Sequence, residues 1–140
     1  MQVVEALSEK ALDAVFQIRK IVFVEEQKVS AAEEFDEYDI ICQHILLYHE
    51  GHAIATGRLR IFDNIAKLER ICVLAEFRKS GAGKLIIEAL EKMAKELGIT
   101  QAKLNAQTQA RGFYEKAGYV KASEEFLEAG IKHLCMVKRL

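Results

Sequence analysis

The sequence predicts an α/β (α+β) protein with a mixed, mostly antiparallel sheet of about six or seven strands and helices on both faces. The first observation is a series of three strand-like segments joined by short turns, residues 43–48, 53–62 and 66–74. This spacing is typical of an antiparallel meander. The second is a helical segment, residues 83–97, followed by another strand-like segment, residues 101–106. A strand, helix and strand in this order indicate a parallel pair within the same sheet.

The first part of the chain contains a strand, a helix and an acidic loop. Residues 2–6 alternate weakly and predict a strand. Ser8 is a suitable N-cap for a helix that runs to about Phe23, with apolar residues at helical spacing. Residues 24–39 are polar and acidic, and predict an irregular loop with room for a short helix.

Turn residues and a change of period define the remaining elements. The Glu50-Gly51 turn predicts a hairpin, and Gly57 predicts a bulge or a bend in its second strand. Gly98 is placed to end the long helix. A helix at 110–117 and a final pair of strands at 120–126 and 132–138 complete the order β-α-β-β-β-α-β-α-β-β.

Composition excludes several classes of protein. The chain has 140 residues, is 51% hydrophobic and carries a net charge of -1, which predicts one domain over 1–140. This charge favours neither a nucleic-acid nor a membrane partner. There is no apolar run of about 18 residues and no signal-like N-terminus, so we expect a cytoplasmic protein. Cys42, Cys72 and Cys135 lack framework spacing, which predicts reduced thiols buried in the core and no metal site.

A glycine-rich turn opens the long helix and predicts an anion site. The turn and the first residues of the helix are Arg78, Lys79, Ser80, Gly81, Ala82, Gly83 and Lys84. Free N–H groups and the helix dipole attract phosphate at such a position, and glycine lets the backbone approach it. Three basic residues strengthen this interpretation over the alternative, a turn that is merely tight.

The turn does not fit the two common nucleotide motifs. A P-loop requires glycine where Arg78 stands and Ser or Thr after Lys84, where this chain has Leu85. A dinucleotide-binding turn requires glycine at Ile86. Both motifs are therefore rejected.

The pattern Arg-x-x-Gly-x-Gly after an apolar strand resembles the coenzyme A signature of the GNAT superfamily of N-acetyltransferases. A second segment, residues 110–119, is similar to that family's Ala-x-x-Phe-Tyr-x-x-x-Gly-aromatic motif. The predicted element order matches the same fold over nearly the whole chain. Residues 19–27 and 104–109 further resemble a small bacterial subgroup of undefined substrate.

The resemblance implies a role for each matching position. Ile71, Cys72 and Val73 would follow the pantetheine arm of acetyl-coenzyme A, on a strand that separates from its neighbour, and the amides of 79–84 would hold the pyrophosphate. Tyr114 matches the tyrosine that protonates the departing thiolate; the alternative is a packed tyrosine whose hydroxyl is hydrogen-bonded. Gln107 stands where many members carry a cofactor-binding asparagine.

The reaction implied is direct attack of an amine on the acetyl group, with Glu69 as the candidate base or, equally, a partner in a salt bridge. The acidic stretch at 25–39 suggests a cationic acceptor, or else a solvated charge run. Two alternatives remain: a non-catalytic acyl-coenzyme A sensor, and an acyl-homoserine lactone synthase, although those enzymes are usually longer. Members of the superfamily are often homodimers, so a homodimer is a further expectation.

Overall fold

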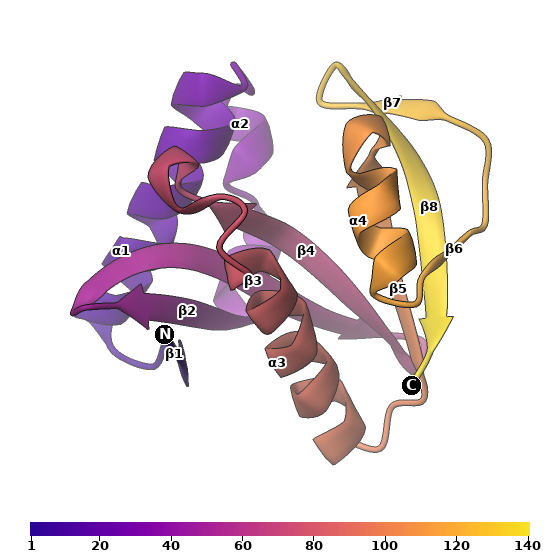
Figure 1. Ribbon diagram of the computed structural model, residues 1–140, viewed down its shortest axis with the longest axis horizontal. Helices are drawn as coiled ribbons and strands as arrows, with labels where there is room; N and C mark the ends of the chain where they lie inside the picture. Colours follow the sequence, from indigo (N-terminus) through magenta and orange to yellow (C-terminus); the bar gives the residue numbers. More distant parts are fainter.

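The computed structural model describes all 140 residues and has the mixed α/β fold that the sequence predicts (Figure 1). Eight strands form one sheet in the order β1-β2-β3-β4-β5-β8-β6, and β7 also pairs with β8. Every pair is antiparallel except β4 with β5. The prediction of a mixed, mostly antiparallel sheet is confirmed.

The elements follow the predicted order. The strands are β1 (Gln2–Glu5), β2 (Gln43–His49), β3 (His52–Phe62), β4 (Ile65–Val73), β5 (Gln101–Gln107), β6 (Val120–Lys121), β7 (Phe126–Glu128) and β8 (Ile131–Arg139). The α-helices are α1 (Glu9–Arg19), α2 (Ala31–Glu34), α3 (Ala82–Glu96) and α4 (Arg111–Lys116). Between them lie the π-helix η1 (Lys20–Glu26) and the 3₁₀ helices η2 (Glu37–Ile40), η3 (Ala75–Phe77) and η4 (Thr108–Ala110).

The first helix begins as predicted but changes geometry before its end. The Ser8 hydroxyl accepts a hydrogen bond from the Ala11 N–H at 3.1 Å and caps α1. After Arg19 the chain continues as η1, and the last turn closes with the Gln27 N–H donating to the Val22 carbonyl at 3.0 Å. A π-helix of this length is rare, and such segments are frequent at functional sites.

The prediction of one continuous strand at 120–126 is wrong. The chain leaves the sheet after Lys121 and returns at Phe126, so β6 and β7 pair separately with β8. The reason is a side chain that takes the place of the backbone: the Ser123 hydroxyl accepts a hydrogen bond from the Cys135 N–H at 2.9 Å. This break raises the number of strands to eight.

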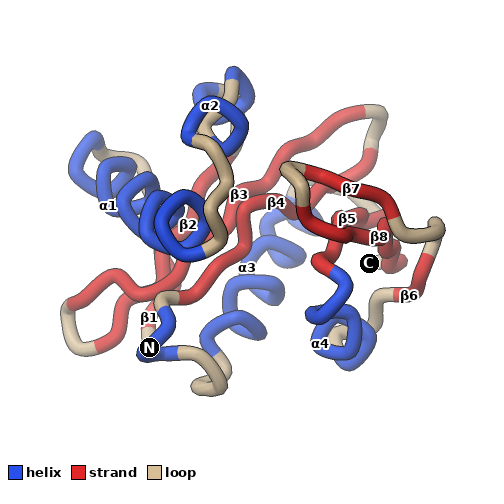
Figure 2. The backbone as a smooth tube through the Cα atoms, turned by 90° about the horizontal axis from the view of Figure 1, so that it is seen from above, coloured by secondary structure: helices blue, strands red, loops and turns tan.

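Helices cover both faces of the sheet, as Figure 2 shows. A cluster of six buried residues, including Val15, Ile18 and Cys72, lies under α1. A cluster of 19 lies on the other face, where α3 contributes Ile86 and Leu90. No helix is long and apolar enough to cross a membrane.

Gly57 allows α3 to lie close to the middle of the sheet. A Cβ at this position would come within 2.7 Å of Ile86 Cγ2 and 3.0 Å of Leu90 Cδ1. An irregularity does occur at Gly57, where the register of β3 with β4 shifts between Thr56 and Arg58, but the extra residue of the bulge lies in β4 rather than in β3. The hairpin between β2 and β3 is confirmed, with Glu50 and Gly51 both at positive φ.

A buried ion-pair network, which we call the arginine network, holds the segment after α1 against the sheet. Its members are Arg19, Glu34, Asp36, Asp39, Arg58, Glu69 and Arg70. The Asp39 carboxylate lies 2.7 Å from a nitrogen of both Arg19 and Arg58, whose side chains are at most 1% exposed. Buried charges are tolerated only when they are paired in this way.

We therefore predict that Asp39→Asn destabilises the protein, because it removes the charge that compensates two buried guanidinium groups. The expected loss in free energy of unfolding is about 3 kcal/mol, measured by urea denaturation at neutral pH. Glu37→Gln is the control, since Glu37 is exposed on the same 3₁₀ helix. An equal effect of the two substitutions would contradict the importance of the pairing.

The same variant should respond less to acid. Burial alone would raise the pKa of Asp39, but the hydrogen bonds and charges of Arg19 and Arg58 outweigh it and lower the pKa. A lowered pKa contributes stability above the ordinary carboxyl range near pH 4, and this is lost as the pH falls through the folded-state value. Unfolding measured between pH 7 and pH 3 should therefore show a smaller loss for Asp39→Asn than for wild type.

Candidate active site

The candidate site is a cleft between β4 and β5. The two strands pair only at Ala66 with Ala102 and at Lys67 with Lys103. Beyond these residues the strands separate (Figure 1). A cavity of about 750 Å³ occupies the gap and is lined from both strands, a size within the range of small-molecule sites.

The cleft brings together nearly all the residues that the sequence indicated. Those that line it are Glu69, Ile71, Cys72, Val73, Arg78, Lys79, Gly81, Ala82, Gly83, Lys84, Gln107 and Tyr114. Ser80 is the exception, since its hydroxyl donates a hydrogen bond to the Phe77 carbonyl and its side chain is not among the lining.

A bulge bends β4 where it lines the cleft. Arg70 and Ile71 together lie opposite the single residue Gly57 of β3. Arg70 has a φ of 57°, in the left-handed region that costs a non-glycine residue about 1–2 kcal/mol. Its guanidinium pairs with Glu34 at 3.2 Å and with Asp36 at 3.1 Å. These ion pairs help to offset the backbone strain.

The glycine-rich turn presents free N–H groups at the start of α3. Gly81 has a φ of 89° and precedes the helix without a side-chain cap. The Leu85 N–H is the first to bond back, to the Gly81 carbonyl at 3.2 Å, so the N–H groups of the three residues between them precede the first helical hydrogen bond. A Cβ on Gly83 would lie 3.1 Å from the Phe113 ring. The turn therefore has the backbone features of an anion site.

Arg78 is already engaged by an acid. Its two terminal nitrogens lie 2.6 and 2.7 Å from the Glu26 carboxylate, and its Nε donates to the Val73 carbonyl at 3.0 Å. This hydrogen bonding lowers the pKa of Glu26. Lys79 forms no ion pair, and the one acid near Lys84 is Glu88, at 3.8 Å. An anion that recruits Arg78 would have to displace Glu26.

Tyr114 projects from α4 into the cleft. Its ring packs edge-on against Phe113 and Tyr119, with centroids 5.1 and 6.1 Å away. Its hydroxyl has no hydrogen-bond partner in the protein, unlike that of Tyr119, which donates to Glu91 at 2.9 Å. Burial raises the pKa of Tyr114 well above its usual range. The hydroxyl therefore keeps its proton at neutral pH.

Glu69 is the opposite case, a fully paired carboxylate. It lies 2.8 Å from Arg58, 3.1 Å from Arg60 and 3.2 Å from Lys67. Burial alone would raise its pKa, but the hydrogen bond from Arg60 and the charge of Arg58 lower it. A carboxylate held in this way accepts a proton poorly. Of the two roles that the sequence allowed for Glu69, a base or a partner in a salt bridge, these contacts fit the salt bridge.

Cys72 is a buried thiol rather than a nucleophile. Burial raises its pKa, so the thiolate that a nucleophile requires is absent at neutral pH. The expectation that every cysteine is buried is wrong for Cys42 and Cys135, which are half-buried, and all three are free.

The acidic segment differs from both interpretations of the sequence. Glu34, Asp36 and Asp39 point inward and belong to the arginine network. They are neither a solvated charge run nor an open negative surface. The acids that remain exposed include Glu25 and Glu33.

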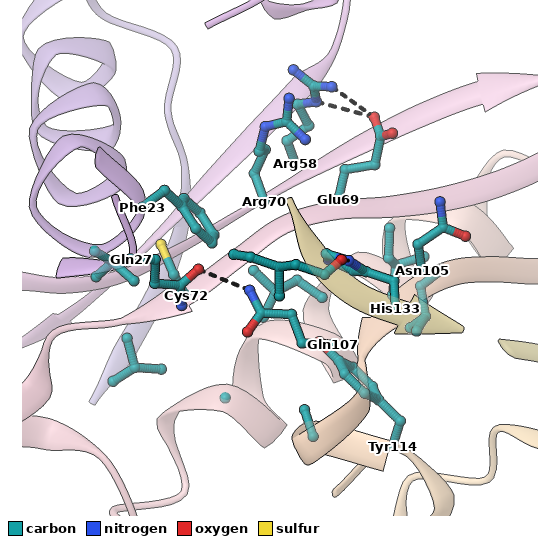
Figure 3. A pocket seen from close by; sticks show the side chains of 18 of the residues that line it. Phe23, Gln27, Arg58, Glu69, Arg70, Cys72, Asn105, Gln107, Tyr114 and His133 are labelled. Atoms are coloured by element: carbon teal, nitrogen blue, oxygen red, sulfur yellow. Dashed lines mark hydrogen bonds and ion pairs between the residues drawn. The ribbon is translucent and has the colours of Figure 1, made fainter. Parts of the chain in front are cut away.

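Several lining residues were not assigned to the site from the sequence. Phe23 and Gln27 reach the cleft from the η1 region, and Asn105 and His133 reach it from β5 and β8 (Figure 3). Gln107 spans the cleft, since its Nε2 donates to Gln27 Oε1 at 2.8 Å. Phe23, Gln27 and Asn105 lie in the segments 19–27 and 104–109 that resemble the bacterial subgroup, whereas His133 had only its place in a predicted strand. Placing these residues in the site also required the strand register.

Comparison with known proteins agrees with the fold and the two motifs. A family model described as an acetyltransferase (GNAT) domain matches residues 7–140. The chain belongs to the GNAT acetyltransferase family. This GNAT chain is 48% identical over 139 residues to the uncharacterized N-acetyltransferase YjcF of Bacillus subtilis, with 99% of each chain covered.

Solved structures extend the similarity of this GNAT chain to three dimensions. A structure from Lactobacillus plantarum has a TM-score of 0.92 and 30% identity, with 99% of this chain and 97% of that chain covered. An acyl-CoA N-acyltransferase from Pseudomonas aeruginosa has a TM-score of 0.86 and 28% identity, with 98% and 97% covered.

The left-handed backbone at Arg70 yields a stability prediction. If the bulge is intrinsic to β4, Arg70→Gly should be more stable than Arg70→Ala by about 1 kcal/mol, because both lose the ion pairs but glycine adopts positive φ without strain. Urea denaturation of the two variants measures the difference. Within an ordinary strand the order would be reversed, and that outcome would contradict the bulge.

Proposed function

We propose that this GNAT chain transfers an acetyl group from acetyl-coenzyme A to a primary amine by direct attack, without a covalent enzyme intermediate. The observation that carries the proposal is the cleft between β4 and β5, whose lining includes the free N–H groups of α3 and the unpaired hydroxyl of Tyr114. Membership of an acetyltransferase family supports the reaction class. The name of the Pseudomonas aeruginosa protein supports an acyl-coenzyme A donor.

The residues present fit acetyl-coenzyme A, which supplies the acetyl thioester. The N–H groups at the start of α3 suit its pyrophosphate, and the glycine there leaves room for close approach. On the side facing β5, the main chain of β4 beyond Lys67 has no strand partner. The groups of Ile71, Cys72 and Val73 on this edge can therefore hydrogen-bond the pantetheine amides, and an N–H there can stabilise the oxyanion.

Tyr114 is the proposed general acid. In the reaction a bond forms between the amine nitrogen and the acetyl carbon, and the carbon–sulfur bond breaks. The departing sulfur takes a proton from the Tyr114 hydroxyl, and the tyrosine regains one from the amine through solvent. A raised pKa keeps this hydroxyl protonated until the thiolate develops. Cys72 has no part in the transfer, since its thiol stays protonated.

The proposed acceptor is a primary amine on a small molecule or peptide. The acidic segment no longer supports a cationic acceptor by itself, because Glu34, Asp36 and Asp39 are neutralised by arginines. A non-catalytic sensor would share the cofactor features but not use the Tyr114 hydroxyl. Binding of acetyl-coenzyme A without release of free thiol across an amine panel would favour that alternative.

The proposed cofactor site can be tested by calorimetry with acetyl-coenzyme A. We expect Gly81→Glu to weaken binding at least 10-fold, because it strains the turn and places a carboxylate beside the pyrophosphate. Gly98→Glu is the matched control: Gly98 also has positive φ and open space around a Cβ, but lies at the far end of α3. No binding of wild type at millimolar cofactor, or equal weakening by both substitutions, would overturn the assignment.

The role of Tyr114 predicts a split between turnover and binding. Tyr114→Phe should lower kcat about 100-fold and change the affinity for acetyl-coenzyme A less than about twofold, because only a proton donor is lost. Tyr48→Phe, which changes a half-buried tyrosine on β2, is the control. Thiol release measured with an acceptor amine decides the point, and unchanged kcat in Tyr114→Phe would remove the tyrosine from the mechanism.

A further inference from the structure

A second polar cluster lies in the cleft, apart from the arginine network. It consists of Asn105 on β5, Glu128 on β7 and His133 on β8, and all three residues line the cavity. Asn105 Nδ2 donates to Glu128 Oε1 at 3.2 Å. The other carboxylate oxygen of Glu128 lies 3.7 Å from His133 Nε2. Figure 3 shows Asn105 and His133 across the cavity from Phe23 and Gln27.

The backbone fixes which nitrogen of His133 can accept a proton. Nδ1 lies 2.7 Å from the Ile131 carbonyl. A carbonyl oxygen can only accept a hydrogen bond, so Nδ1 carries the hydrogen and Nε2 of the neutral ring carries the lone pair. The distance of 3.7 Å from Nε2 to Glu128 is too long for a hydrogen bond. Nε2 therefore has no partner in the protein.

The free nitrogen of His133 opens on the cleft. The residue is only 7% exposed, and one ring face stacks on Phe126 with centroids 6.2 Å apart. Nε2 of His133 is not enclosed by protein, because the only enclosed side-chain nitrogen or oxygen without a partner is Nδ1 of His44. Since His133 also lines the cavity, its accessible Nε2 faces that space. His133 lies directly opposite Gln107, the residue that spans the cleft.

We propose that Glu128 and His133 bind the acceptor amine and that His133 Nε2 is the base that deprotonates it. This inference rests on the proposed acetyl transfer and assigns its missing base. Glu128 Oε2 and His133 Nε2 are 3.7 Å apart, so an ammonium nitrogen beside the pair can bridge both atoms at about 2.9 Å from each. The carboxylate binds the cation, and imidazole is the side chain suited to accept a proton near neutral pH.

The protons balance over the whole reaction. The bound ammonium gives one proton to His133 Nε2, which passes it to solvent, and the neutral amine attacks the thioester carbon. The nitrogen loses a second proton as the amide forms, and this offsets the proton that Tyr114 gives to the sulfur. The products are an amide, a thiol and one released proton. Glu69, with three cations around it, is not required as a base.

The test begins with thiol release from acetyl-coenzyme A in the presence of butylamine, cadaverine, spermidine or lysine amide, and continues with the fastest of these. His133→Asn keeps a donor near the Ile131 carbonyl but removes the base, so kcat should fall about 100-fold while calorimetry shows unchanged acetyl-coenzyme A affinity. Glu128→Gln should raise KM for the amine about 10-fold. His52→Asn, which changes the exposed first residue of β3, is the control.

Chemical rescue separates a base from a structural residue. Added imidazole should restore at least a tenth of wild-type kcat to His133→Ala, because it can occupy the vacated space and accept the proton. Turnover of His133→Asn within twofold of wild type, or failure of imidazole to restore activity, overturns the inference. Loss of acetyl-coenzyme A binding in either His133 variant also overturns it, since the residue would then support the fold. Silence of the wild type with all four amines overturns the proposed transfer itself.

Discussion

The separation of β4 from β5 is the constraint on which the candidate site depends. The strands pair at only two positions, and the bulge at Arg70 and Ile71 follows three residues after the last of them. A flat continuation would close the gap with main-chain hydrogen bonds and leave no cavity. Because the strands diverge, the edge of β4 stays available, and residues from β5, β8 and α4 face it across open space. The start of α3 lies on the same cleft because only the short helix η3 and the glycine-rich turn separate it from the end of β4.

Electrostatics maintains this geometry from the α1 face of the sheet. Arg58 connects the acidic segment to Glu69, and Arg70 connects the strained residue of β4 to the same segment. The network thus connects the acidic segment to β4, and both contribute residues to the lining of the cleft. It also explains why a carboxylate on β4 is a poor base, since its charge is already used by three cations. The polar groups that remain free, Tyr114 and His133, come from the C-terminal part of the chain.

The sequence predicted what short-range patterns encode. The turn around Gly81 and the helix that bears Tyr114 were found because each feature lies within one motif, and the meander followed from turn spacing. The arginine network could not be predicted, because Glu34, Asp36 and Asp39 come from a segment expected to be an irregular loop and meet Arg19 and Arg58 only in the folded chain. His133 required two further facts, the pairing of β8 with β5 and the break at Ser123. Nothing in residues 120–126 marks that break, since the segment contains neither glycine nor proline.

In the proposed complex, acetyl-coenzyme A binds along β4 with its pyrophosphate at the start of α3. Backbone amide chemical shifts of ¹⁵N-labelled protein, titrated with acetyl-coenzyme A, test this position by position. We expect the largest shifts on residues 71–73 and 79–84, with smaller ones at Gln107 and Tyr114. Shifts confined to other faces, such as β1 or the outer end of β8, or no shifts at millimolar cofactor, would contradict it.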